Sequence, residues 1–240
     1  MDAGMAAVLV AAAISLKAPL TDAARRFSTT NPGDPITFTF GSSGQLAAQI
    51  EQGAPVDLFV SASPVELERL AIGEHIDGAT RTTLAGNRLV IVVARGGELP
   101  ADLAGLAAPR FARIAIGNPR TVPAGRYARQ ALVATGIADA VAARLVYAEN
   151  AHQIVALVER GETDAAVLYA TDAAQGGDAL SPALEIPDAL HAPILCEGAV
   201  VALAAAGERA LAFLRFLGSA AGREIFVKHG FVAPRTTAPR

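Results

Sequence analysis

The sequence predicts an α/β protein in which strands and helices alternate along the chain. Short runs rich in valine, isoleucine and leucine are separated by segments with apolar residues at helical spacing. This alternation is typical of βαβ units, which build mainly parallel sheets with helices on both faces. The 240 residues are 52% hydrophobic and 18% charged, a composition typical of an ordinary compact soluble protein with one large or two modest domains.

Charge and cysteine content argue against several classes of protein. The net charge is −3 and the basic residues are scattered singly, which argues against nucleic-acid binding. The single cysteine, Cys196, cannot form an intramolecular disulfide or a cysteine-rich metal site, and we interpret it as a small buried hydrophobic residue. The four histidines are far apart in sequence and none has a second ligand at metal spacing, so no protein-ligated metal is predicted.

The apolar run from Met5 to Leu16 is interpreted as the first strand and not as a signal peptide. No lysine or arginine precedes it, and about a dozen residues are too few to span a bilayer. We therefore expect no membrane insertion, and a natural targeting signal, if there was one, would have been removed.

Residues 41–62 predict a helix followed by a buried strand. The helix has a serine at its N-cap position, Ser42 or Ser43, and a terminating glycine, Gly53, and an apolar run covers residues 57–60. Around this stretch the pattern predicts strands at 6–14 and 36–40 and helices that start near Ser15 and at Ser63.

The rest of the chain continues the alternation. The turn signal Gly86-Asn87 precedes a β-branched run that begins a second lobe. From there the pattern predicts strands at 89–93, 113–117, 144–147, 165–169, 184–186 and 194–203, with helices at 102–107, 124–135, 152–160 and two within 208–229.

Familiar catalytic motifs are missing from the sequence, but a recurrent pattern is present. There is no GxxxxGK[ST], GxGxxG, HExxH or GxSxG segment. Four small or hydroxyl residues lie between a strand and a helix, and helix N-termini gathered at the carboxyl ends of strands favour an anion. The loops at 121–125 and 148–151 lack good capping side chains, so their N–H groups would be free for a ligand. The alternative that the serines are only helix caps stays open. The four residues are Ser15, Ser43, Ala124 and Ala151.

Six segments together resemble the periplasmic molybdate-binding proteins of bacterial ABC importers. They span nearly the whole chain in the family's order, and the GAPxDxF segment and the VPAG loop are the most specific. The segments are AAAISL at 11–16, FGSSGQLAAQIEQGAPVDLFVSA at 40–62, TRTTLAGNRLVIVVA at 80–94, VPAGRYARQAL at 122–132, ALVERGETDAAVLYATDA at 156–173 and EIFVKHGF at 224–231.

This resemblance implies a two-lobed type II periplasmic-binding fold with a ligand cleft between the lobes. Residues 1–84 and 196–240 would form lobe I, and residues 85–195 lobe II. The function implied is a periplasmic, monomeric solute-binding protein, not an enzyme, which captures molybdate or tungstate without a cofactor and delivers it to a membrane permease. By motif position, the oxyanion contacts are the hydroxyls of Ser15, Ser43 and Tyr169 and the backbone N–H groups of Ala124 and Ala151.

Capture between two lobes requires a hinge, for which the candidate crossings are 86–89 and 195–198. Two other functions remain open. One is binding of another oxyanion such as sulfate. The other is a transferase on the same two-lobed fold, for which the candidate bases are Glu149, Asp172 and His152, with no paired arrangement among them.

Overall fold

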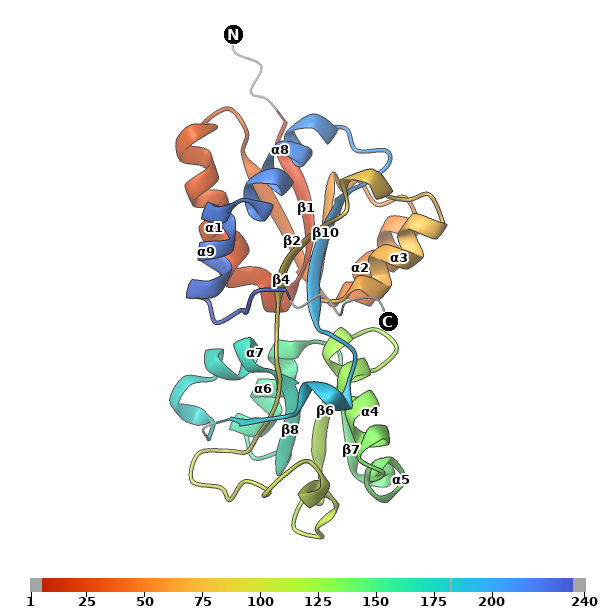
Figure 1. The fold of residues 1–240 in the computed structure, drawn as a ribbon, viewed down its shortest axis with the longest axis vertical. Helices are drawn as coiled ribbons and strands as arrows, with labels where there is room; N and C mark the ends of the chain where they lie inside the picture. The colour runs from red at the N-terminus through yellow and green to blue at the C-terminus, as the bar shows by residue number, and fades with distance from the viewer. Residues whose placement is uncertain (1–5, 182, 235–240) are drawn as a thin grey trace. The chain divides into compact units, whose positions relative to one another are not determined.

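The computed structural model describes residues 6–181 and 183–234, and the chain divides into two units. Of the described residues, those up to Gly86 and from Leu195 onward form unit 1, and Asn87 to Ile194 form unit 2. Each unit has a five-stranded sheet flanked by helices (Figure 1). The predicted α/β class is confirmed. The apolar run expected to begin the chain includes Met5, which lies outside the described residues.

Unit 1 has the strand order β2-β1-β3-β10-β4. Strand β1 is parallel to β2 and β3, whereas β10 is antiparallel to β3 and β4. Strand β10 is therefore antiparallel to all the other described strands of this sheet. The elements are β1 (Val8–Ala13), η1 (Ile14–Leu16), α1 (Lys17–Thr30), β2 (Ile36–Gly41), α2 (Ser43–Glu51), β3 (Leu58–Ser61), α3 (Pro64–Ile72), η2 (Gly78–Thr80), β4 (Thr82–Gly86), β10 (Leu195–Val200), α8 (Gly207–Gly218) and α9 (Ala220–Lys228).

The apolar face of α2 explains why the segment after β2 is helical. Leu46, Ala47 and Ile50 lie on one face of this helix and pack against Phe59 of β3 and Leu67 of α3. Full burial of a large aliphatic or aromatic side chain stabilises the fold by about 1.5–3 kcal/mol. Helices α2 and α3 cover one side of the sheet, and α1, α8 and α9 cover the other (Figure 1).

The two ends predicted for α2 turn out differently. Gly53 lies just beyond the helix with φ of +84°, the left-handed conformation that favours glycine, so the predicted stop is confirmed. Ser42 occupies the N-cap position, but its side chain makes no capping hydrogen bond. Its Oγ is buried and has no partner among the described residues. By contrast, Ser63 caps α3, because its Oγ accepts from the Val65 N–H at 3.2 Å.

The aspartate of the GAPxDxF segment is a structural residue. The carboxylate of Asp57 accepts from the Leu9 N–H and from the Ala206 N–H, each at 2.8 Å. It therefore ties the beginning of β3 to β1 and to the segment that leads into α8. These contacts lie at the amino ends of the parallel strands, opposite to their carboxyl ends.

Unit 2 has the strand order β7-β6-β8-β5-β9. Strand β6 is parallel to β7 and β8, and β5 is antiparallel to β8 and β9. The segment 102–107, predicted as a helix, is a 3-10 turn over 104–107. The elements are β5 (Leu89–Val92), η3 (Ala104–Ala107), β6 (Ile114–Gly117), α4 (Pro123–Ala134), α5 (Ala138–Val141), η4 (Ala142–Arg144), β7 (Leu145–Ala148), α6 (Ala151–Glu159), β8 (Ala165–Tyr169), α7 (Ala170–Gln175), η5 (Gly177–Ala179), β9 (Leu184–Glu185) and η6 (Asp188–Leu190).

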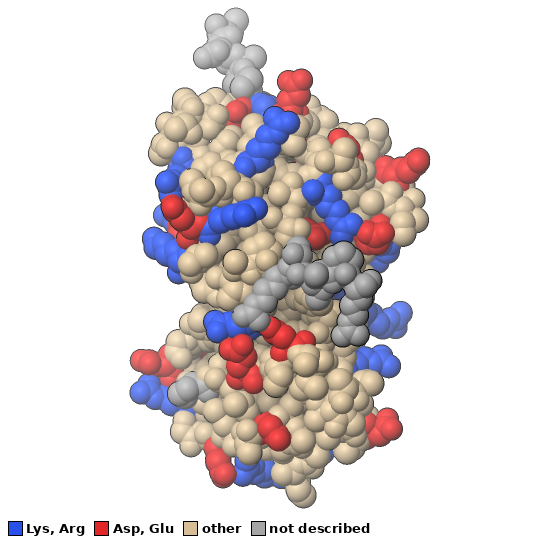
Figure 2. All heavy atoms as spheres, in the orientation of Figure 1, with Lys and Arg blue, Asp and Glu red and all other residues tan. Residues whose placement is uncertain are grey.

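Within the described ranges, no helix combines the length and the apolar character needed to cross a membrane. On the face drawn in Figure 2, lysine and arginine side chains are interspersed with aspartate and glutamate and do not gather in one basic area.

Candidate functional site

The carboxyl ends of β2, β1 and β3 form an edge of unit 1, here called the unit 1 donor edge. Ala13 of β1 is paired with Gly41 of β2, and Ser15 and Ser43 follow these paired residues closely. Ser15 belongs to the turn η1, which joins β1 to α1, and Ser43 is the first residue of α2. Their exposed fractions are 4% and 0%. Both serines predicted for this lobe therefore lie at the same edge of one sheet.

A backbone group fixes the hydrogen-bonding role of Ser43. Its Oγ accepts from the N–H of Ala62, which follows β3, at 3.2 Å. A serine hydroxyl has one proton to donate. No described residue accepts this proton from Ser43. The hydroxyl is therefore free to donate to a ligand while its oxygen is held in place.

The carboxyl ends of β7, β6 and β8 form the corresponding unit 2 donor edge. Gly117 of β6 is paired with Ala148 of β7, and α4 and α6 begin shortly after these strands. Ala124 is in the first turn of α4, Ala151 is the first residue of α6, and Tyr169 ends β8. All three are buried. The three residues predicted for this lobe are also brought to one edge of a sheet.

The first turn of α4 lies against β6, and two glycines make this approach possible. A Cβ added at Gly125 would collide with the carbonyl oxygen of Gly117, and a Cβ at Gly117 would collide with Val122. In this turn the Gly125 N–H donates to the Val122 carbonyl oxygen at 3.0 Å. The Ala124 N–H has no acceptor among the described residues, and the Val122 side chain does not cap the helix.

The prediction that the loop before α6 lacks a capping side chain is wrong. Asn150 is the N-cap, and its Oδ1 accepts from the Gln153 N–H at 3.0 Å. This cap satisfies a donor deeper in the first turn and leaves the helix start itself open. The Ala151 N–H has no acceptor within the part of the chain that the structure describes.

Tyr169 is fixed by its neighbours in sheet and sequence. It is paired with Leu89 of β5, and its ring centroid is 6.3 Å from that of Tyr127. The helix α7 begins directly after it, and Thr171 Oγ1 in that first turn accepts from Asn87 Nδ2 at 2.9 Å. The backbone that carries Tyr169 is thus tied to the residue where the chain enters unit 2.

A buried carboxyl group follows Tyr169 closely. Asp172 is fully buried, and neither of its oxygens has a hydrogen-bond partner among the described residues. Burial raises the pKa of Asp172 to about 7, because an apolar environment disfavours the charged form. Among the described residues, no group of three or more histidine, cysteine, aspartate or glutamate side chains could hold a metal ion.

Three polar groups near the predicted contacts were not assigned to the site from the sequence. Thr121 Oγ1, in the loop before α4, and Ser42 Oγ are buried without a partner among the described residues. The third is the Ala62 N–H. The hydroxyls could have been noticed as neighbours of Ala124 and Ser43, but the amide contact depends on how three strand ends meet and has no sequence signal.

Comparison with known proteins places the chain in a family. The family model for bacterial extracellular solute-binding proteins matches residues 8–232. The molybdate-binding protein ModA of Haemophilus influenzae is 33% identical over 235 residues, covering 96% of this chain and 92% of that protein. A putative ABC transporter substrate-binding lipoprotein of Bacillus subtilis is 32% identical over 229 residues, covering 93% and 85%.

The fold agrees with this relationship. The periplasmic molybdate-binding protein of Azotobacter vinelandii matches with a TM-score of 0.85 and 25% sequence identity, covering 95% of this chain and 100% of that one. The relatives are solute-binding components of transporters and not enzymes, which rules out the transferase alternative. The chain belongs to the bacterial extracellular solute-binding protein family.

Proposed function

We propose that this protein captures molybdate, and also tungstate, and delivers the oxyanion to the membrane permease of an ABC importer. The observation that carries the proposal is the gathering of uncharged donors at the carboxyl ends of parallel strands in each unit. The relationship to molybdate-binding proteins supports the choice of ligand. In this proposal the protein acts as a monomer in the periplasm.

In this proposal one anion is bound between the two units. From unit 1, Ser15 and Ser43 donate hydrogen bonds through their hydroxyl groups. Ala124 and Ala151 donate through their backbone N–H groups from unit 2, and Tyr169 donates through its hydroxyl. No cofactor and no protein-ligated metal takes part, because molybdenum enters as its oxyanion.

The chemistry of the donors suits a tetrahedral dianion without protons. Each of the five groups can donate a hydrogen bond, and a fully deprotonated oxyanion can only accept. A hydrogen bond to a charged partner contributes about 1.5–3 kcal/mol, so several neutral donors bind a dianion without lysine or arginine. Protonated phosphate would bring a donor to a site that offers only donors, and it is therefore rejected.

Binding from both units couples capture to closure. The chain crosses between the units at Gly86–Asn87 and at Ile194–Leu195, close to the hinge segments expected from the sequence. A ligand that contacts both units favours the closed state by the free energy of the contacts made in that state alone.

A thermal-shift panel tests the function. The purified protein is heated with molybdate, tungstate, sulfate, phosphate or chromate at equal concentration. Molybdate and tungstate should raise the melting temperature strongly, because a ligand that binds only the folded state stabilises it. A largest shift with sulfate would favour the alternative oxyanion, and no shift with any of the five would refute the proposed function.

Calorimetry of two variants tests the site. Ser43→Ala and Tyr169→Phe each remove one donor, and each should weaken molybdate binding by about 1–3 kcal/mol. Ser28→Ala is a matched control, because Ser28 is exposed on α1 and its Oγ bonds only to its own helix. Unchanged affinity in both donor variants would show that these residues do not form the site.

A further inference from the structure

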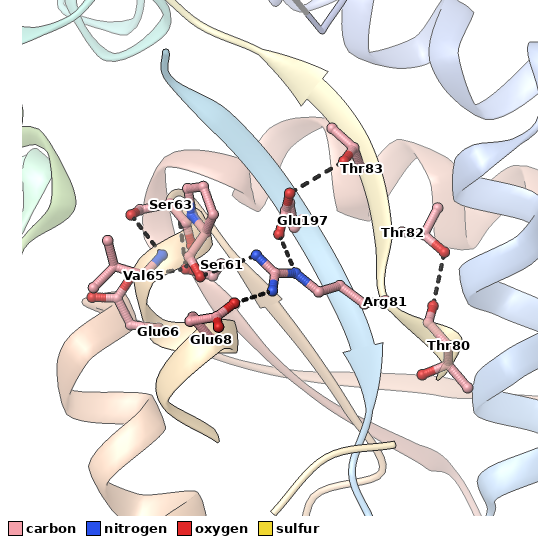
Figure 3. Close-up of polar contacts among 11 residues, drawn as sticks. Ser61, Ser63, Val65, Glu66, Glu68, Thr80, Arg81, Thr82, Thr83 and Glu197 are labelled. Carbon is pink, nitrogen blue, oxygen red and sulfur yellow. Dashed lines mark hydrogen bonds and ion pairs between the residues drawn. The ribbon is translucent and has the colours of Figure 1, made fainter. Parts of the chain in front are cut away.

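The turn between β3 and α3 is held by one buried serine. Ser61 is fully buried, and its Oγ donates to the carbonyl oxygen of Ser63 at 2.7 Å and accepts from the Ser63 N–H at 3.1 Å. Glu66 Oε2 lies 3.3 Å from the same oxygen. Figure 3 shows Ser61 beside Ser63, with their contacts as dashed lines. Both of these backbone bonds go to Ser63, so the hydroxyl of Ser61 fixes the backbone directly after residue 62.

An ion-pair network braces this turn from outside. The Arg81 guanidinium pairs with Glu197 of β10 and with Glu68 of α3, in both cases at 2.7 Å. Its third contact reaches the carbonyl oxygen of Pro64, at 3.5 Å. Arg81 thus connects the start of α3 to the sheet, as Figure 3 shows.

The residue in the middle of the turn acts on the unit 1 donor edge. Ala62 N–H donates to Ser43 Oγ at 3.2 Å. A serine hydroxyl rotates freely unless a neighbour fixes it, and it can then present either its proton or a lone pair. With the Ala62 N–H on one lone pair, the Ser43 proton points away from the turn.

We propose that Ser61 is a positioning residue for oxyanion binding, which acts by holding the Ala62 N–H so that the Ser43 hydroxyl is oriented as a donor before the ligand arrives. The inference rests on the proposed function. Orientation in advance raises affinity because the ligand no longer has to order the hydroxyl on binding. Ser61 touches no ligand in this account and acts only through Ser43.

A double-mutant cycle tests whether Ser61 acts through Ser43. Molybdate affinity is measured by calorimetry for the unsubstituted protein, Ser61→Ala, Ser43→Ala and the double variant. Ser61→Ala should weaken binding about tenfold by itself but less than about twofold when Ser43 is already alanine, because coupled residues are not additive. A residue that only stabilises the fold would cause the same loss in both backgrounds.

Ser63→Ala is the matched control. It removes the α3 cap and should lower the melting temperature, but the Ser63 backbone groups that bond to Ser61 remain. Its molybdate affinity should stay within about twofold of the unsubstituted protein, because a cap contributes to stability and not to the donor set.

A measurement on the unsubstituted, ligand-free protein gives an independent test. Hydrogen exchange followed by NMR should show the Ala62 amide protected, and exchange at the rate of an open amide would overturn the inference. Equal losses for Ser61→Ala in both backgrounds would also overturn it. Failure of the unsubstituted protein to bind molybdate would instead overturn the proposed function, and this inference with it.

Discussion

The two donor edges present hydrogen-bond donors by different means. In unit 1 the proposed donors are side-chain hydroxyls, and the Ala62 N–H holds the hydroxyl of Ser43 in position. In unit 2 two of the three proposed donors are backbone N–H groups at helix starts, which the helix itself directs. The arrangement in unit 2 requires close packing, because α4 contacts β6 at positions where only glycine fits. The donor geometry of unit 1 should therefore be sensitive to the loss of side chains, and that of unit 2 to changes in packing.

The largest expected effect comes from the glycine contact in unit 2. Gly125→Ala forces α4 away from β6 and should lower the free energy of unfolding by about 3 kcal/mol or more. Gly41→Ala at the end of β2 is the control in unit 1, because its Cβ would meet only the Leu46 side chain, at 3.4 Å. Urea unfolding of both variants measures the difference. Equal free energies of unfolding for the two variants would contradict the proposed difference in packing between the units.

A pH effect of a few kcal/mol should come from Asp172 in unit 2. Its folded-state pKa is raised to about 7, so the folded protein keeps a proton that the unfolded chain loses. Stability should fall as pH rises from about 4 to about 7 and level off above that, by an amount on the order of a few kcal/mol. Asp172→Asn should remove this part of the slope in unfolding curves measured between pH 4 and 8.

Asp178→Asn is the matched control, since the Asp178 side chain is 98% exposed in the same unit. An unchanged slope in Asp172→Asn would contradict the assignment.

In unit 1 a pKa shift of the opposite sign occurs at Asp22. The hydrogen bond from His229 Nε2, at 2.6 Å, lowers the pKa of Asp22. That contribution is present above the unfolded pKa and is lost only as the pH falls through the lowered folded value.

One of the two proposed backbone donors in unit 2, the Ala151 N–H, can be deleted without damage to its helix. Ala151 is the first residue of α6, where proline is well accommodated, and Asn150 before it is extended. Ala151→Pro removes the N–H and should weaken molybdate binding by about 1–3 kcal/mol or more, measured by calorimetry. Ala151→Ser keeps the N–H and should bind like the unsubstituted protein. The reverse order of affinities would count against a backbone contact.

The smallest expected effect separates two N-caps. Asn150→Ala removes the hydrogen bond to the Gln153 N–H and should cost about 1 kcal/mol of stability. Ser42→Ala removes a buried hydroxyl that has no partner among the described residues, so it should not lower stability. Thermal unfolding of the two variants measures the difference, and a larger loss for Ser42→Ala would show that its hydroxyl has a partner in solution.

Much of the fold was predictable from local patterns. The ends of α2 and α3 carry their own signals, such as Gly53 and the Ser63-Pro64 pair, and the apolar runs of β6 and β8 read directly as strands. Strand β4 (Thr82–Gly86) was not predicted, because TTLAG is a short segment without a run of apolar β-branched residues. It is a strand because β10, more than a hundred residues later, pairs with it.

The candidate site divides in the same way. The positions of Ser15, Ser43, Ala124 and Ala151 follow from the alternation of strands and helices. The contacts that shape these positions do not, because they join segments distant in sequence. The Ala62 N–H on Ser43, the meeting of Gly117 with Gly125 and the burial of Asp172 all arise when the elements pack, which no local pattern encodes.

One consequence concerns how the chain could be re-engineered. Among the described residues, unit 2 is a continuous insertion in unit 1, and its two ends meet, because the Asn87 N–H donates to the Ile194 carbonyl oxygen at 3.2 Å. The cut ends of unit 1, Gly86 and Leu195, are likewise paired. Residues 87–194 therefore have the geometry of a cassette that could be excised, circularly permuted or exchanged with that of a relative. Such chimaeras would combine the proposed serine donors of one protein with the unit 2 donors of another.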